Sequence, residues 1–317
     1  MTHHHPGTGK YEGLLAKCRS LEAIPTAVAY PCETSALEGA IEAGQKGLIE
    51  PILVGPAEKI AEIAKSSGIN LGGTQVVDAR DGRQAAAKAV ELVLHGKAEL
   101  LMKGSLHTDE LLGAVVAREA GLRTGRRISH VFIMDVPTYH KVLIVTDAAI
   151  NIAPTLEDKV DICQNAIDLA VSLGLAQPKV AILAAVETVN SKMTATLDAA
   201  ALCKMTERGQ ITGGLLDGPL AFDNAINQEA AETKGIHSKV AGDPDILLAP
   251  DLEAGNILAK LLSFLANADS AGLVLGARVP IILTSRADSV RSRIASCGVA
   301  MLAAHARKTG AQGAHHG

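Results

Sequence analysis

Short apolar runs alternate along the chain with longer stretches in which apolar residues recur every three or four positions. The first pattern is typical of buried strands and the second of helices that cover a sheet. We expect strands at residues 26–29, 51–54, 74–77, 99–102, 131–134, 142–145, 180–183, 211–214, 246–248, 272–275 and 281–283. We expect helices at residues 11–24, 57–65, 83–95, 109–118, 155–173, 195–208, 219–234 and 252–265, and a last one from about residue 290. This alternation predicts mainly parallel sheets covered by helices on both faces.

One pair of strands departs from that alternation. Residues 131–134 and 142–145 are joined only by residues 135–141, which contain Pro137. Because this connection is too short for a helical crossover, the two strands are antiparallel or cross between domains. We therefore place a domain junction near Pro137. The first α/β domain is expected to comprise residues 1–136 plus 272–317, and the second residues 137–271.

A polar tripeptide, Thr284-Ser285-Arg286, follows the strand at 281–283 and precedes the last helix. Asp288 or Ser289 is placed to cap that helix. The free N–H groups of a helix start bind anions, and an arginine can grip phosphate with two parallel hydrogen bonds. The same tripeptide could equally be an ordinary polar loop with a cap. From local sequence alone, both interpretations stay open.

Further polar loops follow other predicted strands. Lys103-Gly104-Ser105-Leu106-His107-Thr108 could contact a phosphate, or could be a solvated turn. The segment from Asp147 to Asn151 carries a carboxylate that could bind substrate or close a turn. A cluster of arginines could bind a polyanionic cofactor, although such clusters are usually solvated. Its members are Arg118, Arg123, Arg126 and Arg127.

Four carboxylates flank the predicted strand at 246–248: Asp243, Asp245, Asp251 and Glu253. Oxygen ligands of this kind suit hard cations. No histidine or regular loop spacing supports such a site, and an acid in the first turn of a helix also stabilises its dipole. We therefore favour a capping role and expect no bound metal.

Composition narrows the class of protein. The chain has 317 residues, a net charge of −4, no tryptophan, three tyrosines and three phenylalanines. These values argue against a nucleic-acid surface, which is usually basic and uses aromatic rings for stacking. We find no apolar run long enough to span a membrane and no signal peptide, so we expect a cytoplasmic protein. The five cysteines are widely spaced and are expected to be reduced and buried.

Several of these segments occur in an order that resembles the phosphate acetyl/butyryltransferase family. The segments are Lys103-Gly-Ser, Val131-Phe-Ile-Met, Asp147-Ala-Ala-Ile-Asn, Gly218-Pro-Leu-Ala-Phe-Asp, Pro250-Asp-Leu-Glu-Ala-Gly-Asn256 and Thr284-Ser-Arg. The resemblance covers roughly residues 25–300, and it is closer to the phosphate butyryltransferase branch than to the long phosphotransacetylases.

The resemblance implies two α/β/α domains with an interdomain cleft, in an isopropylmalate-dehydrogenase-like fold, usually within a homodimer. It implies reversible acyl transfer between coenzyme A and orthophosphate through an acyl phosphate. Ser285 would bind the thiol or the tetrahedral centre, and Arg286 would hold the phosphoryl group. The family's acid/base aspartate corresponds to Ser292 here, so Asp288 is the nearest carboxylate that could replace it. A cysteine of the family corresponds to Ala148.

Residues that we expect to bind the substrates lie in the other segments. They are Lys103, Gly104, Ser105, His107, Arg127, Asp147, Asn151, Asp251 and Asn256. Two alternatives stay open. One is a metal- and NAD(P)-dependent hydroxyacid dehydrogenase of similar fold, which would use Asp243, Asp245, Asp251 and residues of the arginine cluster. The other is a non-catalytic protein that binds coenzyme A or phosphate, because Ser292 replaces the aspartate.

Overall fold

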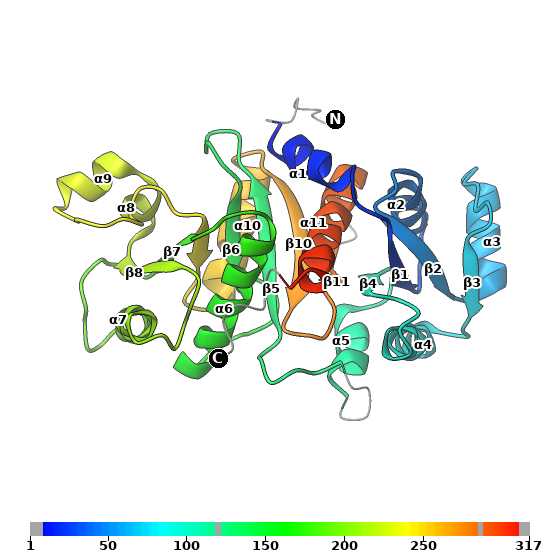
Figure 1. The fold of residues 1–317 in the computed structure, drawn as a ribbon, viewed down its shortest axis with the longest axis horizontal. Helices are drawn as coiled ribbons and strands as arrows, with labels where there is room; N and C mark the ends of the chain where they lie inside the picture. The colour runs from blue at the N-terminus through cyan, green and yellow to red at the C-terminus, as the bar shows by residue number, and fades with distance from the viewer. Residues whose placement is uncertain (1–8, 118–121, 285–287, 311–317) are drawn as a thin grey trace. The chain divides into compact units, whose positions relative to one another are not determined.

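The computed structural model describes residues 9–117, 122–284 and 288–310. The chain divides into two compact units, whose helices and strands are labelled in Figure 1. The first unit contains residues 11–126 and 271–308, and the second is built mainly from residues 127–270. Residues 127–136, which the sequence placed with the first domain, lie in the second unit. The pairing of 131–134 with 143–146 explains this placement.

The first unit is a mainly parallel sheet with helices around it. Its elements are α1 (Lys10–Cys18), β1 (Ile24–Ala29), α2 (Thr34–Gln45), β2 (Ile49–Gly55), α3 (Ala57–Ser66), β3 (Gln75–Asp78), α4 (Gly82–Leu94), β4 (Leu100–Lys103), α5 (Thr108–Val116), β10 (Asp269–Leu275), β11 (Ile281–Ile282) and α11 (Val290–Lys308). The strand order is β3-β2-β1-β4-β11-β10, and only β10 runs antiparallel to its neighbour β11. The carboxyl ends of β1, β4 and β11 therefore lie at one edge.

The second unit has the same general design. Its elements are β5 (Ser129–Asp135), β6 (Leu143–Thr146), α6 (Leu156–Ser172), β7 (Lys179–Leu183), α7 (Thr194–Glu207), β8 (Leu215–Leu220), α8 (Phe222–Ile226), α9 (Gln228–Thr233), β9 (Ile246–Leu248) and α10 (Leu252–Phe264). The strand order is β5-β6-β9-β7-β8. β5 is antiparallel to β6, as the short connection predicted, and the other pairs are parallel.

The apolar pattern matches the burial of the strands. The side chains of β4, β6 and β9 are buried along their whole length, as expected for strands covered on both faces. Helix starts are fixed by side-chain caps. Asp81 accepts from Gln84 N at 2.8 Å, and Asp251 accepts from Ala254 N at 2.8 Å. Each cap satisfies an N–H that the helix leaves free.

Two sequence predictions in the second unit were wrong, and one helix of the first unit was missed. The strand expected at 211–214 begins only at Leu215, because Gly213 has φ +82° and makes a turn there. The helix expected at 219–234 is two short helices, because Asn227 is extended and caps the second. Helix α2 was not predicted, although Ala36, Leu37, Ala40 and Ile41 recur at helical spacing and are buried.

Candidate functional site

The loop between β11 and α11 carries the predicted Ser285-Arg286 pair, which lies outside the described residues. The residues on either side are described. Thr284, at the end of the strand, is 3% exposed. On the other side, Ser289 caps α11, because its hydroxyl accepts from Ser292 N at 3.1 Å. Of the two caps that the sequence left open, Ser289 is therefore the one observed.

The resemblance drawn from the sequence places Ser292 at the position of the family's aspartate, and the side chain of Ser292 is buried. Its hydroxyl is 3.2 Å from that of Ser289. A serine hydroxyl in this position has no basicity comparable to a carboxylate, so Ser292 does not replace the aspartate as a base. Asp288 stays the predicted acid/base residue. Its negative charge also favours the charged form of the buried guanidinium of Arg293.

The loop after β4 is tied to the ends of two other strands. Lys103 is 6% exposed, and its Nζ donates to the carbonyl of Gly104 at 3.2 Å and to that of Thr284 at 3.4 Å. Ser105 Oγ donates to Tyr30 O at 2.9 Å and accepts from Cys32 N at 3.1 Å. The loop therefore brings a buried cation to the end of β11 and links it to the end of β1.

Gly104 and Tyr30 show how close this approach is. A Cβ on Gly104 would collide with the carbonyl oxygens of Ala29 and Tyr30. Tyr30 itself has φ +55°, a left-handed conformation that is strained for a residue with a side chain. Glycine at position 104 thus serves the packing of two strand ends. His107 is exposed at the start of α5, and its N–H donates to Glu110 Oε2 at 3.1 Å.

Arg293 is a residue that the sequence analysis missed. It lies in the first turns of α11, is 2% exposed, and its Nη1 donates to Thr284 Oγ1 at 3.0 Å. Burial lowers the pKa of its guanidinium, and the charges of Asp288 and Glu33 counter that effect. The available signal in the sequence was the position of Arg293 beside the apolar positions Ile294 and Cys297, which indicates an inward-facing arginine. Because charged residues are rarely buried without a specific partner, such an arginine is expected to have one.

In the second unit, the loop after β6 is organised by Asp147, which is 3% exposed. Its Oδ1 accepts from Ala149 N at 2.9 Å and Ile150 N at 3.1 Å. Its Oδ2 accepts from the backbone N of Asn151 at 3.2 Å and from Asn151 Nδ2 at 2.5 Å. These bonds close a turn, which was one of the two readings left open. A direct role toward substrate stays a prediction.

Asn151 joins this turn to Arg127. Its Nδ2 donates to Ile128 O at 2.9 Å, while its Oδ1 accepts from Arg127 Nε at 2.8 Å. Arg127 Nη1 also lies 3.3 Å from Asp158 Oδ1, yet the arginine side chain is 53% exposed. Its guanidinium is therefore oriented from one side and open to solvent on the other. Arg118 of the predicted cluster lies outside the described residues.

The start of α10 packs directly on the same turn. Asn256 Nδ2 donates to Ala148 O at 2.9 Å, and a Cβ on Gly255 would collide with the carbonyl oxygen of Asp147. Asp251 caps the helix. Two segments far apart in sequence, residues 147–151 and 250–256, are thus brought together at the carboxyl ends of β6 and β9.

His130 is a second residue that the sequence analysis missed. It lies near the start of β5, where its carbonyl accepts from Thr146 Oγ1 at 2.8 Å, and it is 1% exposed. Among the described residues its Nδ1 has no hydrogen-bond partner. Burial lowers the pKa of the imidazole to about 4, although the charge of Asp147 acts in the other direction. His130 is therefore neutral at pH 7.

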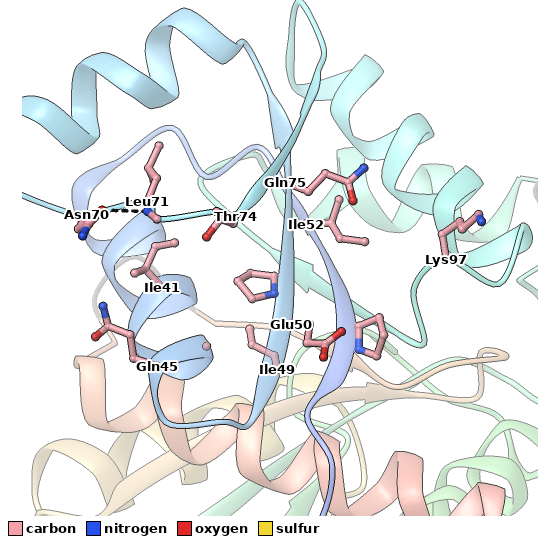
Figure 2. A pocket seen from close by; sticks show the side chains of 15 residues that line it. Ile41, Gln45, Ile49, Glu50, Ile52, Asn70, Leu71, Thr74, Gln75 and Lys97 are labelled. Carbon is pink, nitrogen blue, oxygen red and sulfur yellow. Dashed lines mark hydrogen bonds between the residues drawn. The ribbon is translucent and has the colours of Figure 1, made fainter.

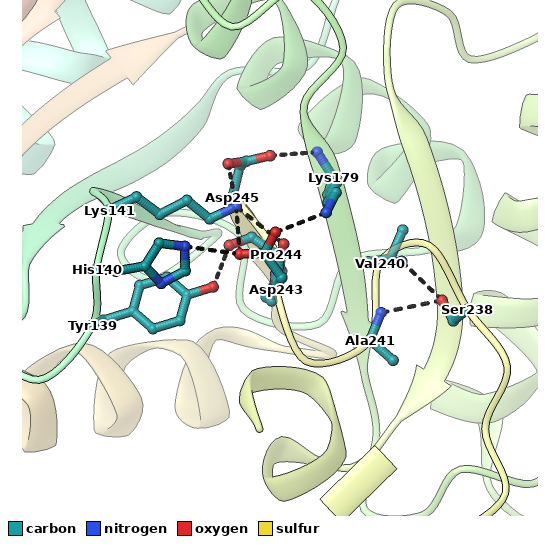
Figure 3. Close-up of polar contacts among 10 residues, drawn as sticks. All are labelled: Tyr139, His140, Lys141, Lys179, Ser238, Val240, Ala241, Asp243, Pro244 and Asp245. Atoms are coloured by element: carbon teal, nitrogen blue, oxygen red, sulfur yellow. Dashed lines mark hydrogen bonds and ion pairs between the residues drawn. The ribbon is translucent and has the colours of Figure 1, made fainter. Parts of the chain in front are cut away.

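The acidic residues of the metal alternative lie at opposite ends of β9. Asp243 and Asp245 precede the strand and form ion pairs with lysines (Figure 3). Asp251 follows the strand. Lys141 Nζ is 3.0 Å from Asp243 Oδ1 and 2.7 Å from Asp245 Oδ1, and Lys179 Nζ is 2.7 Å from Asp243 Oδ2.

The two lysines also set the protonation of this cluster. Burial raises the pKa of Asp243, but the bonds to Lys179 and Lys141 outweigh it, so the pKa is lowered. Within residues 9–117, 122–284 and 288–310, no group of three or more His, Cys, Asp or Glu side chains is arranged to hold a metal ion. In the same residues, no helix is long and apolar enough to cross a membrane.

A groove of about 690 Å³ lies at the amino ends of β1, β2 and β3 (Figure 2). Ile41, Ile49 and Ile52 contribute apolar walls, and Glu50 and Lys97 contribute charges. Because these strands are parallel, the groove lies at the opposite edge of the sheet from Lys103 and Thr284. It is therefore separate from the candidate site.

The five cysteines are all free thiols, four buried and Cys203 partly buried. Burial raises the pKa of Cys18 and Cys32 to about 11 and that of Cys297 to about 12. It also raises the pKa of Cys203 to about 12, and it raises that of Cys163. These thiols are protonated at neutral pH, and a thiol in that state is a poor nucleophile.

Cations and hydroxyls gather at the carboxyl ends of parallel strands, and the fold places the protein in the α/β class, whose members commonly bind ligands at such strand ends. A family model described as phosphate acetyl/butaryl transferase matches residues 81–303. A phosphate acetyltransferase of Rhizobium meliloti is 62% identical over 303 residues, which cover 96% of each chain. A phosphate butyryltransferase of Clostridium beijerinckii is 41% identical over 298 residues, covering 94% of this chain and 99% of the relative. A solved branched-chain phosphotransacylase from Enterococcus faecalis V583 has a TM-score of 0.77 and 30% identity, over 89% of this chain and 99% of its own.

The chain belongs to the phosphate acetyl/butyryltransferase family and is an acyltransferase. The family resemblance and the α/β fold class drawn from the sequence are confirmed. The dehydrogenase alternative is not favoured, because the relatives are acyltransferases and its carboxylates are paired with lysines or used as a cap.

Proposed function

We propose that this protein transfers an acetyl group reversibly between coenzyme A and orthophosphate, with acetyl phosphate as the second acyl carrier. The 62% identity to a phosphate acetyltransferase over almost the whole of both chains is the observation that carries the proposal. The named butyryltransferase is more distant, at 41%. This difference supports acetyl over butyryl as the preferred group.

The reaction requires the thiol of coenzyme A to attack the carbonyl carbon of the acyl phosphate. A sulfur–carbon bond forms, the bond from that carbon to the phosphate oxygen breaks, and the thiol proton is lost. The protein must place two polyanions side by side and stabilise the oxyanion, for which positioning alone supplies on the order of 7–11 kcal/mol. No protein nucleophile is needed, in keeping with the protonated state of the cysteines.

In this proposal Arg286 binds the phosphoryl group, Ser285 binds the thiol or the oxyanion, and Asp288 receives the thiol proton. The exposed side of Arg127 supports a contact with a phosphate of coenzyme A, because Asn151 and Asp158 already orient the guanidinium. Lys103 contributes positive charge at the end of β11. Asp147, Asn151, Asp251 and Asn256 shape the loop of the second unit.

We also propose that the enzyme is a cytoplasmic homodimer. The exposed face of α10 supports self-association, because Ile257, Leu261, Phe264 and Leu265 form an apolar stripe in which each residue is 47–77% exposed. Contiguous apolar surface of this kind marks an interface more often than a solvated face.

The direct test is release of free thiol when purified protein is mixed with phosphate and acetyl-, propionyl- or butyryl-CoA. We expect the highest kcat/KM with acetyl-CoA. Arg286→Ala should reduce kcat on the order of 10²-fold, as expected for loss of a group that stabilises developing charge, and should raise the KM for phosphate. If no acyl-CoA releases thiol, the proposed activity is wrong.

A further inference from the structure

Thr284 is the last described residue before the predicted Ser285-Arg286 pair, and two buried cations hold it from two sides. Lys103 Nζ donates to its backbone carbonyl at 3.4 Å, and Arg293 Nη1 donates to its hydroxyl at 3.0 Å. One contact fixes the position of the strand end and the other fixes the side chain. Asp288, the first described residue after the pair, acts on Arg293 through its charge. A single guanidinium is thus linked to both flanks of the loop.

Helix α2 makes room for the aliphatic stem of Arg293 at Gly39. A Cβ built on Gly39 would lie 2.7 Å from Arg293 Cδ and 3.5 Å from Arg293 Cβ. Real Cβ atoms do not approach other atoms as closely as 2.7 Å, so any larger residue at position 39 would displace the arginine. Gly39 does not have a left-handed φ, so its backbone conformation gives no separate reason for glycine.

Stability alone does not explain a buried arginine at this place. Residues 294, 295 and 297–304 of the same helix are buried and apolar or small. Burying a guanidinium requires its removal from water, and replacing buried ion pairs by apolar residues is often neutral or stabilising. The contact with Thr284 gives the arginine a specific task that an apolar residue could not perform.

We propose that Arg293 is a positioning residue for acyl transfer, which acts through Thr284 to orient the end of β11 from which Ser285 and Arg286 follow. The inference rests on the proposed function, because it gives the reaction a geometric requirement outside the predicted catalytic pair. Gly39 belongs to the same arrangement, since it leaves the space in which the aliphatic stem of Arg293 lies.

The test uses the full-length protein and acetyl-CoA with phosphate. Thr284→Val removes the hydroxyl with little change in volume, and Thr284→Ser keeps it. Gly39→Ala displaces Arg293, whereas Gly13→Ala in α1 is the control, because nothing lies within 4 Å of a Cβ built there. Helix propensity favours alanine at both glycine positions, so it does not predict lost activity at either.

We expect Thr284→Val and Gly39→Ala to lower kcat on the order of 10- to 100-fold, the effect of misplacing reacting groups. The KM for acetyl-CoA should be unchanged. Thr284→Ser and Gly13→Ala should keep wild-type kcat. In the double variant Gly39→Ala/Thr284→Val the losses should not multiply, because both changes break the same contact.

The outcomes separate the inference from the proposed function. An active wild-type protein in which Thr284→Val has the kcat of Thr284→Ser would overturn the positioning role, even if the variant melts at a lower temperature. A wild-type protein that releases no thiol would refute the proposed function, and the inference would fail with it. Arg293→Lys is a further arm. It keeps the charge without the planar fork, so it should show the same kcat loss as Thr284→Val.

Discussion

His130 combines complete burial with a place beside Asp147, and this gives stability a defined pH dependence. The folded-state pKa of about 4 lies below the ordinary value of 6.5. The unfolded chain therefore binds a proton that the folded chain does not, and stability falls as the pH decreases from 6.5 to 4. His130 contributes at most about 1.4 kcal/mol per pH unit to the slope of the free energy of unfolding against pH. Denaturant unfolding of His130→Gln at pH 4.5, 5.5 and 7 should show a flatter dependence than wild type; an equal slope would contradict this assignment.

The proposed acid/base role of Asp288 can be distinguished from the helix-capping role of its neighbour Ser289. If Asp288 receives the thiol proton, Asp288→Asn should lower kcat on the order of 10²-fold and remove the acidic limb of the pH–rate profile. Ser289→Ala is the matched control, because it should cost about 1 kcal/mol of stability as a lost cap and keep the shape of the profile. A normal profile in Asp288→Asn would leave the carboxylate only its electrostatic influence on Arg293.

Sequence reasoning identified several strand-end side chains, but not the contacts that hold them in place. Gly104 and Ser105 were expected to contact a phosphate, which stays a prediction, and the structure shows them joining the ends of β1 and β4. Arg293 and His130 were missed, because their significance comes from burial against residues far away in sequence. Periodicity predicts that position 293 faces the protein interior, but it does not predict that the hydroxyl of Thr284 lies within hydrogen-bond distance there.

At the scale of elements, the two aspartate caps offer a comparison within one molecule. Asp81 and Asp251 cap α4 and α10 with equal bonds of 2.8 Å. Replacing either by alanine should lower the free energy of unfolding by about 1 kcal/mol. Only Asp251→Ala should also raise the KM for a substrate, because α10 begins against the Asp147 turn through Gly255 and Asn256. Chemical denaturation and steady-state kinetics on both variants provide the check, and equal KM values would separate the cap from binding.

Most elements could be predicted from the sequence because their strands are apolar throughout and their helices are amphipathic. The failures have local causes. Ile211–Gly214 has strand-like composition at its start, but the left-handed Gly213 delays the strand. Helix α2 was missed because it is rich in alanine and glycine. The small side chains of its buried face make the apolar pattern difficult to recognise in the sequence. Pairing between strands distant in sequence, such as β4 with β11, required the structure.

For the whole molecule, the stripe on α10 predicts the oligomeric state. If the stripe is the contact between two copies, Leu261→Asp/Phe264→Asp should produce a monomer by light scattering coupled to size exclusion. A matched control is Leu94→Asp, another partly exposed apolar residue on a helix of the other unit. It should keep the wild-type mass. A double variant of unchanged mass would exclude α10 from the interface.

The burial of four cysteines and the partial burial of Cys203 have a consequence for a catalyst that handles thioesters. A chain whose own thiolates were accessible would capture acyl groups from its substrates and inactivate itself by degrees. Here burial raises the pKa of every cysteine well above neutral pH. The thiols of the enzyme are therefore poor nucleophiles toward thioesters and acyl phosphates. Ellman's reagent should accordingly count none of the four buried sulfhydryls in the native protein, should react slowly with Cys203, and should count all five after denaturation.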